Sequence, residues 1–333
     1  MQDASVDPDD AGPPPVAFSG SRLNWHDLPR PVRSRIAQLA GAQVSSETSA
    51  TSGFSPGFAA VLELGDGHES FVKAVSAEQN PQAPDLARRE IAVAAALPAD
   101  VPAPRLLWSH DDGTWVILGF EAVDGRSPEQ PWRRAELDRV LRAIAELAAA
   151  RPLVPNDLPS ITVSMAEDFS GWRTIAGAAG VNRTERAAEF GERGAWVLEH
   201  LDELARWESG WPAAAAGTGL VHGDLRADNV LLDTDRTWLV DWPHASLGAP
   251  WLDLAFMLPS VEMQGGGDAD ELFWAHPVAA GVEPHALRSV LAALAGYFTH
   301  GSIQPAPIGV PNLRRFQQAQ AIVSLDWLRR LPD

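Results

Sequence analysis

The sequence predicts an α+β fold of two lobes, in which a small antiparallel β lobe with one helix precedes a larger, mostly helical lobe. Two observations carry this prediction. Before residue 122, two pairs of short apolar segments, each joined by a turn containing glycine, flank an amphipathic helical pattern. Beyond it, patterns rich in Ala, Leu, Glu and Arg indicate long helices, and the expected strands are few and short.

The elements of the small lobe follow in order along the chain. Residues 1–20 are acidic and Pro-rich and predict a disordered tail. The lobe itself, residues 21–121, begins with a short helix and continues with a hairpin, a helix ended by Pro98 and a second hairpin. The expected ranges are 29–39 for the first helix, 58–64 and 71–75 for the first hairpin, 85–97 for the second helix, and 105–109 and 114–120 for the second hairpin.

The larger lobe, residues 122–333, begins where the Val123-Asp124-Gly125 turn ends the β-rich region. A length of 333 residues fits about two domains. The expected helices of this lobe are 132–150, 184–207, 284–299 and 313–331, and its expected strands are 219–221, 230–232 and 238–240.

The composition narrows the class of protein. The 45% hydrophobic and 21% charged residues are typical of a globular protein, and no apolar run reaches the roughly 18 residues of a membrane span. The acidic start is unlike a secretion signal, so we expect a cytoplasmic protein without a membrane partner. The absence of cysteine excludes disulfides and thiolate chemistry. The net charge, 26 − 44 = −18, argues against nucleic acid as a partner, and the oligomeric state stays open.

The strongest motif is a polar loop between two of the short strands. It holds His222-Gly223-Asp224 and Asn229, and Asp241 follows the next strand. If the strands on either side of the turn at residues 233–237 pair, Asp241 lies beside the loop. One carboxamide and two carboxylates could then supply oxygen ligands for Mg²⁺ and a carboxylate that takes a proton. The alternative is a polar turn between two core strands.

This pattern, His-Gly-Asp, four residues, Asn and a later Asp at a strand end, resembles the aminoglycoside phosphotransferase and choline-kinase-like family, which is related to the protein kinases. The resemblance implies a two-lobed protein-kinase-like fold, with residues 21–121 as the nucleotide-binding lobe and residues 122–333 as the catalytic and substrate-binding lobe. It also implies that Asp224 is the catalytic base facing the acceptor hydroxyl. Asn229 and Asp241 would hold the Mg²⁺ ions that bridge the nucleotide phosphates.

Lys73 is the single lysine, beside 26 − 1 = 25 arginines. It stands in Phe71-Val72-Lys73-Ala74, which is similar to the kinase strand whose lysine reaches the α- and β-phosphates. Glu90 falls on the inward apolar stripe of the helix 85–97, where a carboxylate needs a cation, and Lys73 can supply it. There are two alternatives. Lys73 could be a lysine left by chance in an Arg-rich composition, and Glu90 could lie in solvent at the edge of its helix.

Further nucleotide-binding residues follow from the resemblance. Ser52, Gly53, Phe54 and Ser55 belong to the segment 52–57, which stands where kinases carry a glycine-rich phosphate loop, although it departs from Gly-x-Gly-x-x-Gly and a plain β-turn is the alternative. The main chain of an inter-lobe hinge, residues 120–123, would meet the purine and would not separate ATP from GTP. Its named members are Glu121, which could equally be a solvated strand end, and Val123.

Four residues near the motif receive weaker interpretations. Arg226 stands where protein kinases place a lysine against the transferring phosphoryl group, and a plain salt bridge is the alternative. His222 is expected to hold the loop by hydrogen bonds. Asp253 is expected to have a structural or substrate-rim role, and Asp228 could be only a turn residue.

The expected function is therefore Mg²⁺-dependent transfer of the γ-phosphate of ATP or GTP to a hydroxyl group of a small molecule. An antibiotic is favoured, which would give antibiotic resistance: an aminoglycoside, a nucleoside such as capuramycin, or a macrolide. Residues 251–333 hold five arginines and eight acids, a modest net of 5 − 8 = −3, and several aromatic residues, which keeps the less charged antibiotics open. The alternatives are a metabolic sugar or amino-alcohol kinase and a non-catalytic nucleotide-binding pseudokinase.

A protein kinase is disfavoured. Asp241-Trp242-Pro243 is not the kinase Asp-Phe-Gly motif, and no Ala-Pro-Glu follows it.

Overall fold

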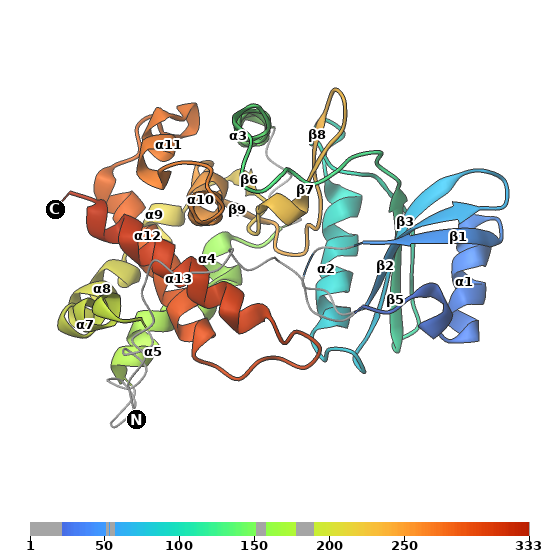
Figure 1. The fold of residues 1–333 in the computed structure, drawn as a ribbon, viewed down its shortest axis with the longest axis horizontal. Coiled ribbons are helices and arrows are strands. Elements are labelled where there is room, and N and C mark those ends of the chain that lie inside the picture. The colour runs from blue at the N-terminus through green and yellow to red at the C-terminus, as the bar shows by residue number, and fades with distance from the viewer. Residues whose placement is uncertain (1–21, 51–52, 54–56, 151–157, 178–189, 333) are drawn as a thin grey trace, which may run out of the picture.

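The computed structural model describes residues 22–50, 53, 57–150, 158–177 and 190–332. The predicted tail 1–20, residues Ser52, Phe54 and Ser55, and the start of the predicted helix 184–207 lie outside the described residues. The described chain forms two lobes, one built on a β-sheet and one mostly helical, as predicted (Figure 1).

The small lobe is a five-stranded antiparallel sheet in the order β1-β2-β3-β5-β4. Helix α1 covers one face, where its Ile36 packs against Phe58 and Val72, and α2 covers the face toward the large lobe (Figure 1). Side chains alternate along a strand, so Lys73, between the buried Val72 and Ala74, lies on the α2 face. The elements are β1 Val44–Ser49, β2 Phe58–Leu64, β3 Glu69–Ser76, β4 Leu106–Asp111, β5 Trp115–Glu121, α1 Arg30–Ala40, α2 Ala83–Ala96 and the 3₁₀ helix η2 Trp25–Asp27.

Both predicted hairpins form, but the sequence analysis did not predict β1. This strand reads Val-Ser-Ser-Glu-Thr-Ser, pairs only with β2 at the edge of the sheet, and has no fully buried residue. An edge strand that is half solvated and polar on both faces lacks the apolar alternation by which strands are recognised.

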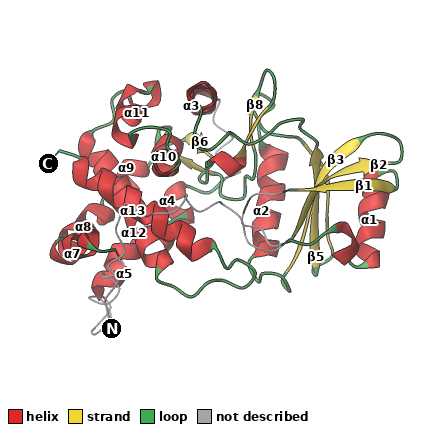
Figure 2. Cartoon of the chain, in the orientation of Figure 1, coloured by secondary structure: helices red, strands yellow, loops and turns green. Residues whose placement is uncertain are grey.

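The large lobe surrounds the long helix α12, which packs against α5, α8, α9 and α13 (Figures 1 and 2). This lobe also holds two short antiparallel strand pairs: the hairpin of β7 with β8, and β6 with β9, which precede and follow that hairpin in the chain. Its helices are α3 Arg134–Ala149, α4 Ile161–Ser164, α5 Gly171–Gly177, α7 Glu192–Glu199, α8 Leu201–Ser209, α9 Trp211–Ala215, α10 Leu252–Met263, α11 Ala269–Ala275, α12 Pro284–Ser302 and α13 Leu313–Arg330. Its strands are β6 Gly219–Val221, β7 Val230–Leu232, β8 Thr237–Leu239 and β9 Ser246–Gly248, and its 3₁₀ helices are η3 Asp168–Ser170, η4 Ala227–Asn229 and η5 Pro277–Ala279.

The predicted helix 184–207 is not continuous in its described part. Helices α7 and α8 meet at His200, whose backbone leaves the helical region (φ −106°, ψ 14°). The His200 ring stacks on Trp196 at 4.6 Å, and its Nδ1 lies 2.9 Å from the Trp196 carbonyl oxygen. The amphipathic pattern continues across this break, so periodicity alone did not reveal it.

Helices α5 and α12 approach so closely that two glycines touch. A Cβ atom on Gly171 would lie 2.1 Å from the carbonyl oxygen of Gly296. This contact places Phe169, just before α5, beside Tyr297 of α12, with ring centroids 6.2 Å apart. Within the described part of the chain, every helix is too short or too polar to serve as a membrane span.

Candidate active site

The loop after β6 is fixed by a buried carboxylate. Asp253, in the first turn of α10, accepts hydrogen bonds from the backbone N–H groups of His222 (2.8 Å) and Gly223 (2.9 Å). Gly223 has φ 83°, and a Cβ atom there would lie 2.7 Å from the His244 carbonyl oxygen. Only glycine fits both conditions, so the loop turns tightly and presents Asp224 at its tip.

His222 ties this loop to the end of β8. Its side chain is buried, its Nε2 donates to the Val240 carbonyl oxygen at 3.0 Å, and its Nδ1 accepts from the Asp224 backbone N–H at 3.3 Å. Burial lowers the pKa of His222 to about 4, which matches a neutral ring with one donor and one acceptor nitrogen. The expectation that His222 holds the loop agrees with these contacts.

Pairing of β7 with β8 brings Asn229 and Asp241 together. The Val240 N–H donates to the Asn229 carbonyl oxygen at 3.0 Å, directly before Asp241. The Asn229 Nδ2 donates to the main-chain oxygen of Asp224 at 2.7 Å and to its carboxylate at 3.2 Å. With the amide nitrogen committed to Asp224, the Asn229 Oδ1 is the side-chain atom left for another partner.

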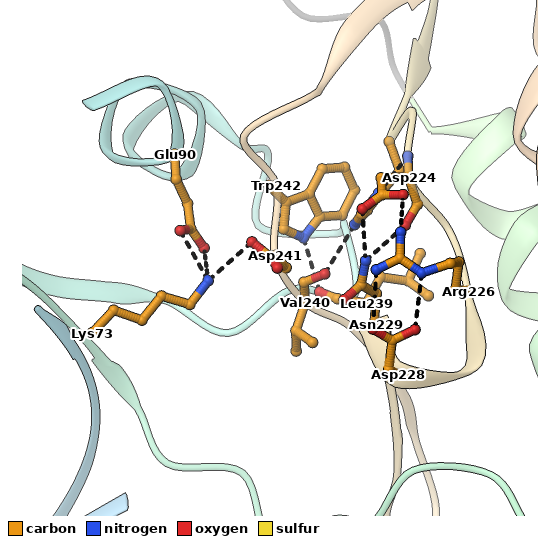
Figure 3. A network of polar contacts seen from close by, with 11 residues as sticks. Lys73, Glu90, Asp224, Arg226, Asp228, Asn229, Leu239, Val240, Asp241 and Trp242 are labelled. Carbon is orange, nitrogen blue, oxygen red and sulfur yellow. Dashed lines mark hydrogen bonds and ion pairs between the residues drawn. The ribbon is translucent and has the colours of Figure 1, made fainter. Parts of the chain in front are cut away.

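Lys73 links the two lobes at this point (Figure 3). Its Nζ lies 2.7 and 2.9 Å from the two Glu90 oxygens and 3.0 Å from the Asp241 Oδ1. Burial alone would raise the pKa of Asp241, but the Lys73 ammonium outweighs burial and lowers this pKa to about 2. For Lys73, burial opposes the charge, but the two carboxylates outweigh burial and raise its pKa. Asp241 and Lys73 are therefore both charged at neutral pH.

Arg226 lies between two carboxylates of the loop. It contacts the Asp224 carboxylate and forms two parallel bonds to Asp228, each 3.0 Å long (Figure 3). Burial raises the pKa of Asp224, and Arg226 opposes this shift. Asp228 thus holds the guanidinium in a fixed fork and is more than a turn residue. The sequence left two alternatives for Arg226, contact with the transferring phosphoryl group or a plain salt bridge. In the structure, Arg226 forms salt bridges with Asp224 and Asp228.

A cavity of about 640 Å³ lies between the lobes. Gly53, Glu121 and Val123 line it together with Lys73, Asn229 and Asp241, so the structure brings these predicted residues to one space. The Glu121 carboxylate accepts from the Arg105 backbone N–H (3.0 Å) and Nε (2.9 Å), and the Glu121 backbone N–H donates to the Arg105 carbonyl oxygen at 3.0 Å.

A second cavity of about 330 Å³ adjoins the first and shares Lys73, Glu90 and Asp241 with it. Asp224 and Arg226 line only this second cavity, which we call the acceptor cavity. Its far wall comes from η3, α12 and α13 and includes Asp168, Phe169, Tyr297 and Phe316. Asp224 therefore lines the acceptor cavity and not the larger one, and the Lys73–Asp241 pair lies at the boundary between the two cavities.

Sequence reasoning missed several residues of these cavities, among them Arg22 and Asp168. Arg22 lines the first cavity, where burial lowers its pKa and Asp241 opposes this shift. Asp168 lines the acceptor cavity, as does Tyr297, one of the aromatic residues of 251–333 that the sequence offered for contact with an acceptor. Arg22 and Asp168 belong to no motif with defined spacing, and only the fold brings them to the site.

The donor set fits Mg²⁺ in a particular way. Within the described ranges, no three His, Cys, Asp or Glu side chains are grouped to hold a metal ion by themselves. Mg²⁺ commonly takes one or two protein oxygens and completes its shell with water and substrate phosphates. The Asn229 amide oxygen and the Asp241 carboxylate, both on the wall of the larger cavity, match this requirement.

Comparison with known proteins agrees with the fold. The model of the phosphotransferase enzyme family (APH) matches residues 51–290. No curated protein sequence matches the chain.

Several solved structures share the fold at low sequence identity. A thermostable mutant of aminoglycoside phosphotransferase APH(4)-Ia, in a ternary complex with AMP-PNP and hygromycin B, shares 19% identity at a TM-score of 0.58, over 90% of this chain and 98% of that chain. Spectinomycin phosphotransferase APH(9)-Ia with ADP and spectinomycin shares 12% identity at 0.51, over 90% and 94%. A choline/ethanolamine kinase family protein from Mesorhizobium loti shares 15% at 0.52, over 92% and 99%.

Proposed function

The chain belongs to the phosphotransferase enzyme family and is a small-molecule kinase, and we propose that it moves the γ-phosphate of ATP or GTP to a hydroxyl group of an antibiotic, with Mg²⁺. One observation carries the proposal. The charged network of Lys73, Asp241 and Asn229 lines a cavity large enough for a nucleotide, and Asp224 lines the adjoining cavity. A donor and an acceptor molecule can therefore meet at the boundary between them.

Each residue has a part in this reaction. Lys73 binds the nucleotide phosphates, and Glu90 holds the Lys73 ammonium in place. Asn229 and Asp241 would hold Mg²⁺, which neutralises charge on the phosphates when it is bound. The main chain at Glu121 and Val123, together with Gly53, contacts the nucleotide from the small lobe. Ser52, Phe54 and Ser55 are proposed to join them.

The chemical step takes place on the acceptor side. The acceptor oxygen forms a bond to the γ-phosphorus, and the bond from that phosphorus to the β–γ bridging oxygen breaks, so the nucleoside diphosphate leaves with the electron pair. Asp224 orients the acceptor hydroxyl and takes its proton. The raised pKa of Asp224 makes it a better base than an ordinary aspartate. Arg226, held by Asp228, places positive charge beside the transferring group.

The test is transfer itself. The protein is incubated with Mg-ATP or Mg-GTP and a panel of hydroxylated antibiotics that includes hygromycin B, spectinomycin, a capuramycin-type nucleoside and a macrolide. We expect a product heavier by one phosphoryl group, formed together with nucleoside diphosphate and lost on adding a chelator. Product formation at full rate with the chelator in excess would remove the metal assignment.

A metabolic kinase for a sugar or an amino alcohol is the second candidate, because one structure of similar fold is from the choline/ethanolamine kinase family. Choline, ethanolamine and simple sugars therefore belong in the panel. If the protein phosphorylates one of these compounds with a higher kcat/KM than every antibiotic, it is a metabolic kinase and the antibiotic assignment is wrong. If the protein binds nucleotide but transfers phosphate to no acceptor, a non-catalytic pseudokinase replaces both kinase assignments.

A further inference from the structure

The acceptor cavity has an aromatic wall. The Phe169 ring lies 5.7 Å from Phe256 and 6.2 Å from Tyr297, and Tyr297 lies 5.1 Å from Phe298, measured between ring centroids. All four residues line the cavity: Tyr297 and Phe298 are partly exposed, and the buried rings of Phe169 and Phe256 continue this apolar cluster into the core. A ligand with an apolar or aromatic body can be desolvated against such a surface, which favours its binding over that of a fully polar ligand.

The charges that line this cavity are paired, with one exception. Glu90 and Asp241 contact Lys73, and Asp224 contacts Arg226. Asp168 differs, because its carboxylate makes no hydrogen bond or ion pair with any residue that the structure describes, and its side chain is exposed. Arg89 and His244 lie within electrostatic range of Asp168, but neither forms an ion pair with it.

Asp168 and Asp224 are close enough to act on one small molecule. The charges of both carboxylates raise the pKa of Tyr297, adding to the larger effect of burial. Burial raises the pKa of Asp168 and of Asp224, and His244 opposes both rises. Asp168, Asp224, Tyr297 and His244 all line the same cavity, and both carboxylates lie within electrostatic range of the ring and the imidazole. One has a guanidinium partner, and the other is available to a cation from solution.

We propose that the acceptor is an alcohol with a single ammonium group and an apolar or aromatic body, bound with its ammonium at Asp168, its body on the aromatic wall and its hydroxyl at Asp224. This inference rests on the proposed function and names the acceptor class. A molecule with several ammonium groups would find one unpaired carboxylate among the described residues of the cavity. Its other charges would be desolvated against rings without compensation.

A matched set of probes separates the two parts of the acceptor. Phenylalaninol carries one hydroxyl, one ammonium and one phenyl ring. Removing the amine gives 3-phenyl-1-propanol, and removing the ring gives 2-amino-1-propanol, with the hydroxyl unchanged in both. Kanamycin represents a polycation without an apolar body. We expect kcat/KM with phenylalaninol to exceed that with each of the other three by about 10-fold or more.

Two variants locate the ammonium. Asp168→Asn removes the unpaired carboxylate, and Glu167→Gln removes the neighbouring exposed carboxylate, which does not line the cavity. Asp168→Asn should lower kcat/KM for phenylalaninol about 10-fold and leave 3-phenyl-1-propanol unchanged, whereas Glu167→Gln should change neither. Equal losses for both probes in Asp168→Asn, or no loss for either, would overturn the assignment of Asp168.

Binding gives a readout that does not depend on turnover. The same probes are titrated calorimetrically into the protein loaded with Mg-AMP-PNP, with the same order of affinities expected. Absence of phosphoryl transfer with the expected binding order counts against the proposed function and for the acceptor class. Tighter binding of kanamycin or 2-amino-1-propanol than of phenylalaninol, or no binding of phenylalaninol at about 10 mM, overturns the acceptor class.

Discussion

Lys73 and Asp241 form an ion pair across the two lobes, with the Nζ of one 3.0 Å from the Oδ1 of the other. Glu90 completes the network from α2, and its side chain is buried in the small lobe. A compact ammonium serves all three contacts at once, two to Glu90 and one to Asp241. This geometry accounts for a lysine at position 73 in a chain whose other basic residues are arginines.

Replacing Lys73 by Arg keeps the charge but substitutes a wide planar fork for the ammonium. We expect turnover to fall about 10²-fold or more, because the fork cannot meet Glu90, Asp241 and the phosphates with the same geometry. Steady-state rates and thermal unfolding measure the two effects. Arg134→Lys, at an exposed ion pair on α3, is the charge-conserving control and should leave both unchanged. A wild-type rate in Lys73→Arg would contradict the phosphate-binding role.

Asp224 and Asp241 should respond differently to neutralisation. Asp224→Asn removes the base but no ligand of the metal, so nucleotide affinity should persist while turnover falls about 10²-fold or more. Asp241→Asn removes a metal-facing charge and should weaken binding of the Mg-nucleotide as well. Calorimetric titration with Mg-AMP-PNP and steady-state rates separate the two. Equal loss of Mg-nucleotide affinity in both variants would make Asp224 chiefly a metal ligand.

His222 and Asp253 should give opposite pH dependences of stability. Burial lowers the pKa of His222 from 6.5 to about 4 and raises the pKa of Asp253 from 3.8 to about 6. Between these values, the unfolded chain binds a proton at His222 that the native state lacks, and the native state binds one at Asp253 that the unfolded chain lacks. The histidine therefore makes stability rise with pH in this window, the aspartic acid makes it fall, and the two effects largely cancel.

Single variants expose each effect. In Asp253→Asn the free energy of unfolding should rise with pH between about 4 and 6, by up to about 1.4 kcal/mol per pH unit, because only the His222 effect remains. In His222→Asn it should fall with pH over the same window. Urea unfolding of both variants and of the wild type at several pH values provides the measurement. If the free energy of unfolding changes with pH in the same way in the wild type and in both variants, the pKa of neither His222 nor Asp253 is shifted by folding.

Gly171→Ala tests the close approach of α5 and α12. The added methyl group would overlap the backbone of Gly296, so we expect a loss of about 1 to 3 kcal/mol in the free energy of unfolding. Gly177→Ala, at the other end of α5, is the matched control, because no residue that the structure describes lies within 4 Å of the added Cβ atom. It should be neutral or slightly stabilising. Comparable losses in both variants would show that the helix contact is not what makes Gly171 necessary.

The part of the site that could be predicted is the part built from local pattern. Glu90 was placed inward by the apolar stripe of its helix, and its buried carboxylate meets the single lysine at 2.7 Å. Asn229 and Asp241 were placed together by the assumption that two short strands pair, and β7 and β8 do pair. Residue type, strand length and spacing along the chain sufficed in both cases.

The acceptor cavity could not be predicted in the same way. Its wall combines Phe169, Phe256, Tyr297 and Phe316 from four separate segments, and in sequence each is an ordinary apolar residue of a helix or turn. Only the packing of η3 and α10 against α12, and of α13 against α10 and α12, brings these rings to one space. Asp168 lies outside every motif for the same reason, and only the fold shows that its carboxylate has no ion-pair partner among the described residues.

Asp241 has φ 68°, and it is the one residue other than glycine with positive φ in the described part of the chain. This left-handed backbone costs an L-residue about 1 to 2 kcal/mol relative to glycine. Glycine at this position would relieve the backbone cost but would also remove the carboxylate that pairs with Lys73 at 3.0 Å. An aspartate therefore stands at position 241 for its side chain and against the preference of its backbone, so an Asp241→Gly substitution in a homologous chain would mark a site that no longer uses this carboxylate.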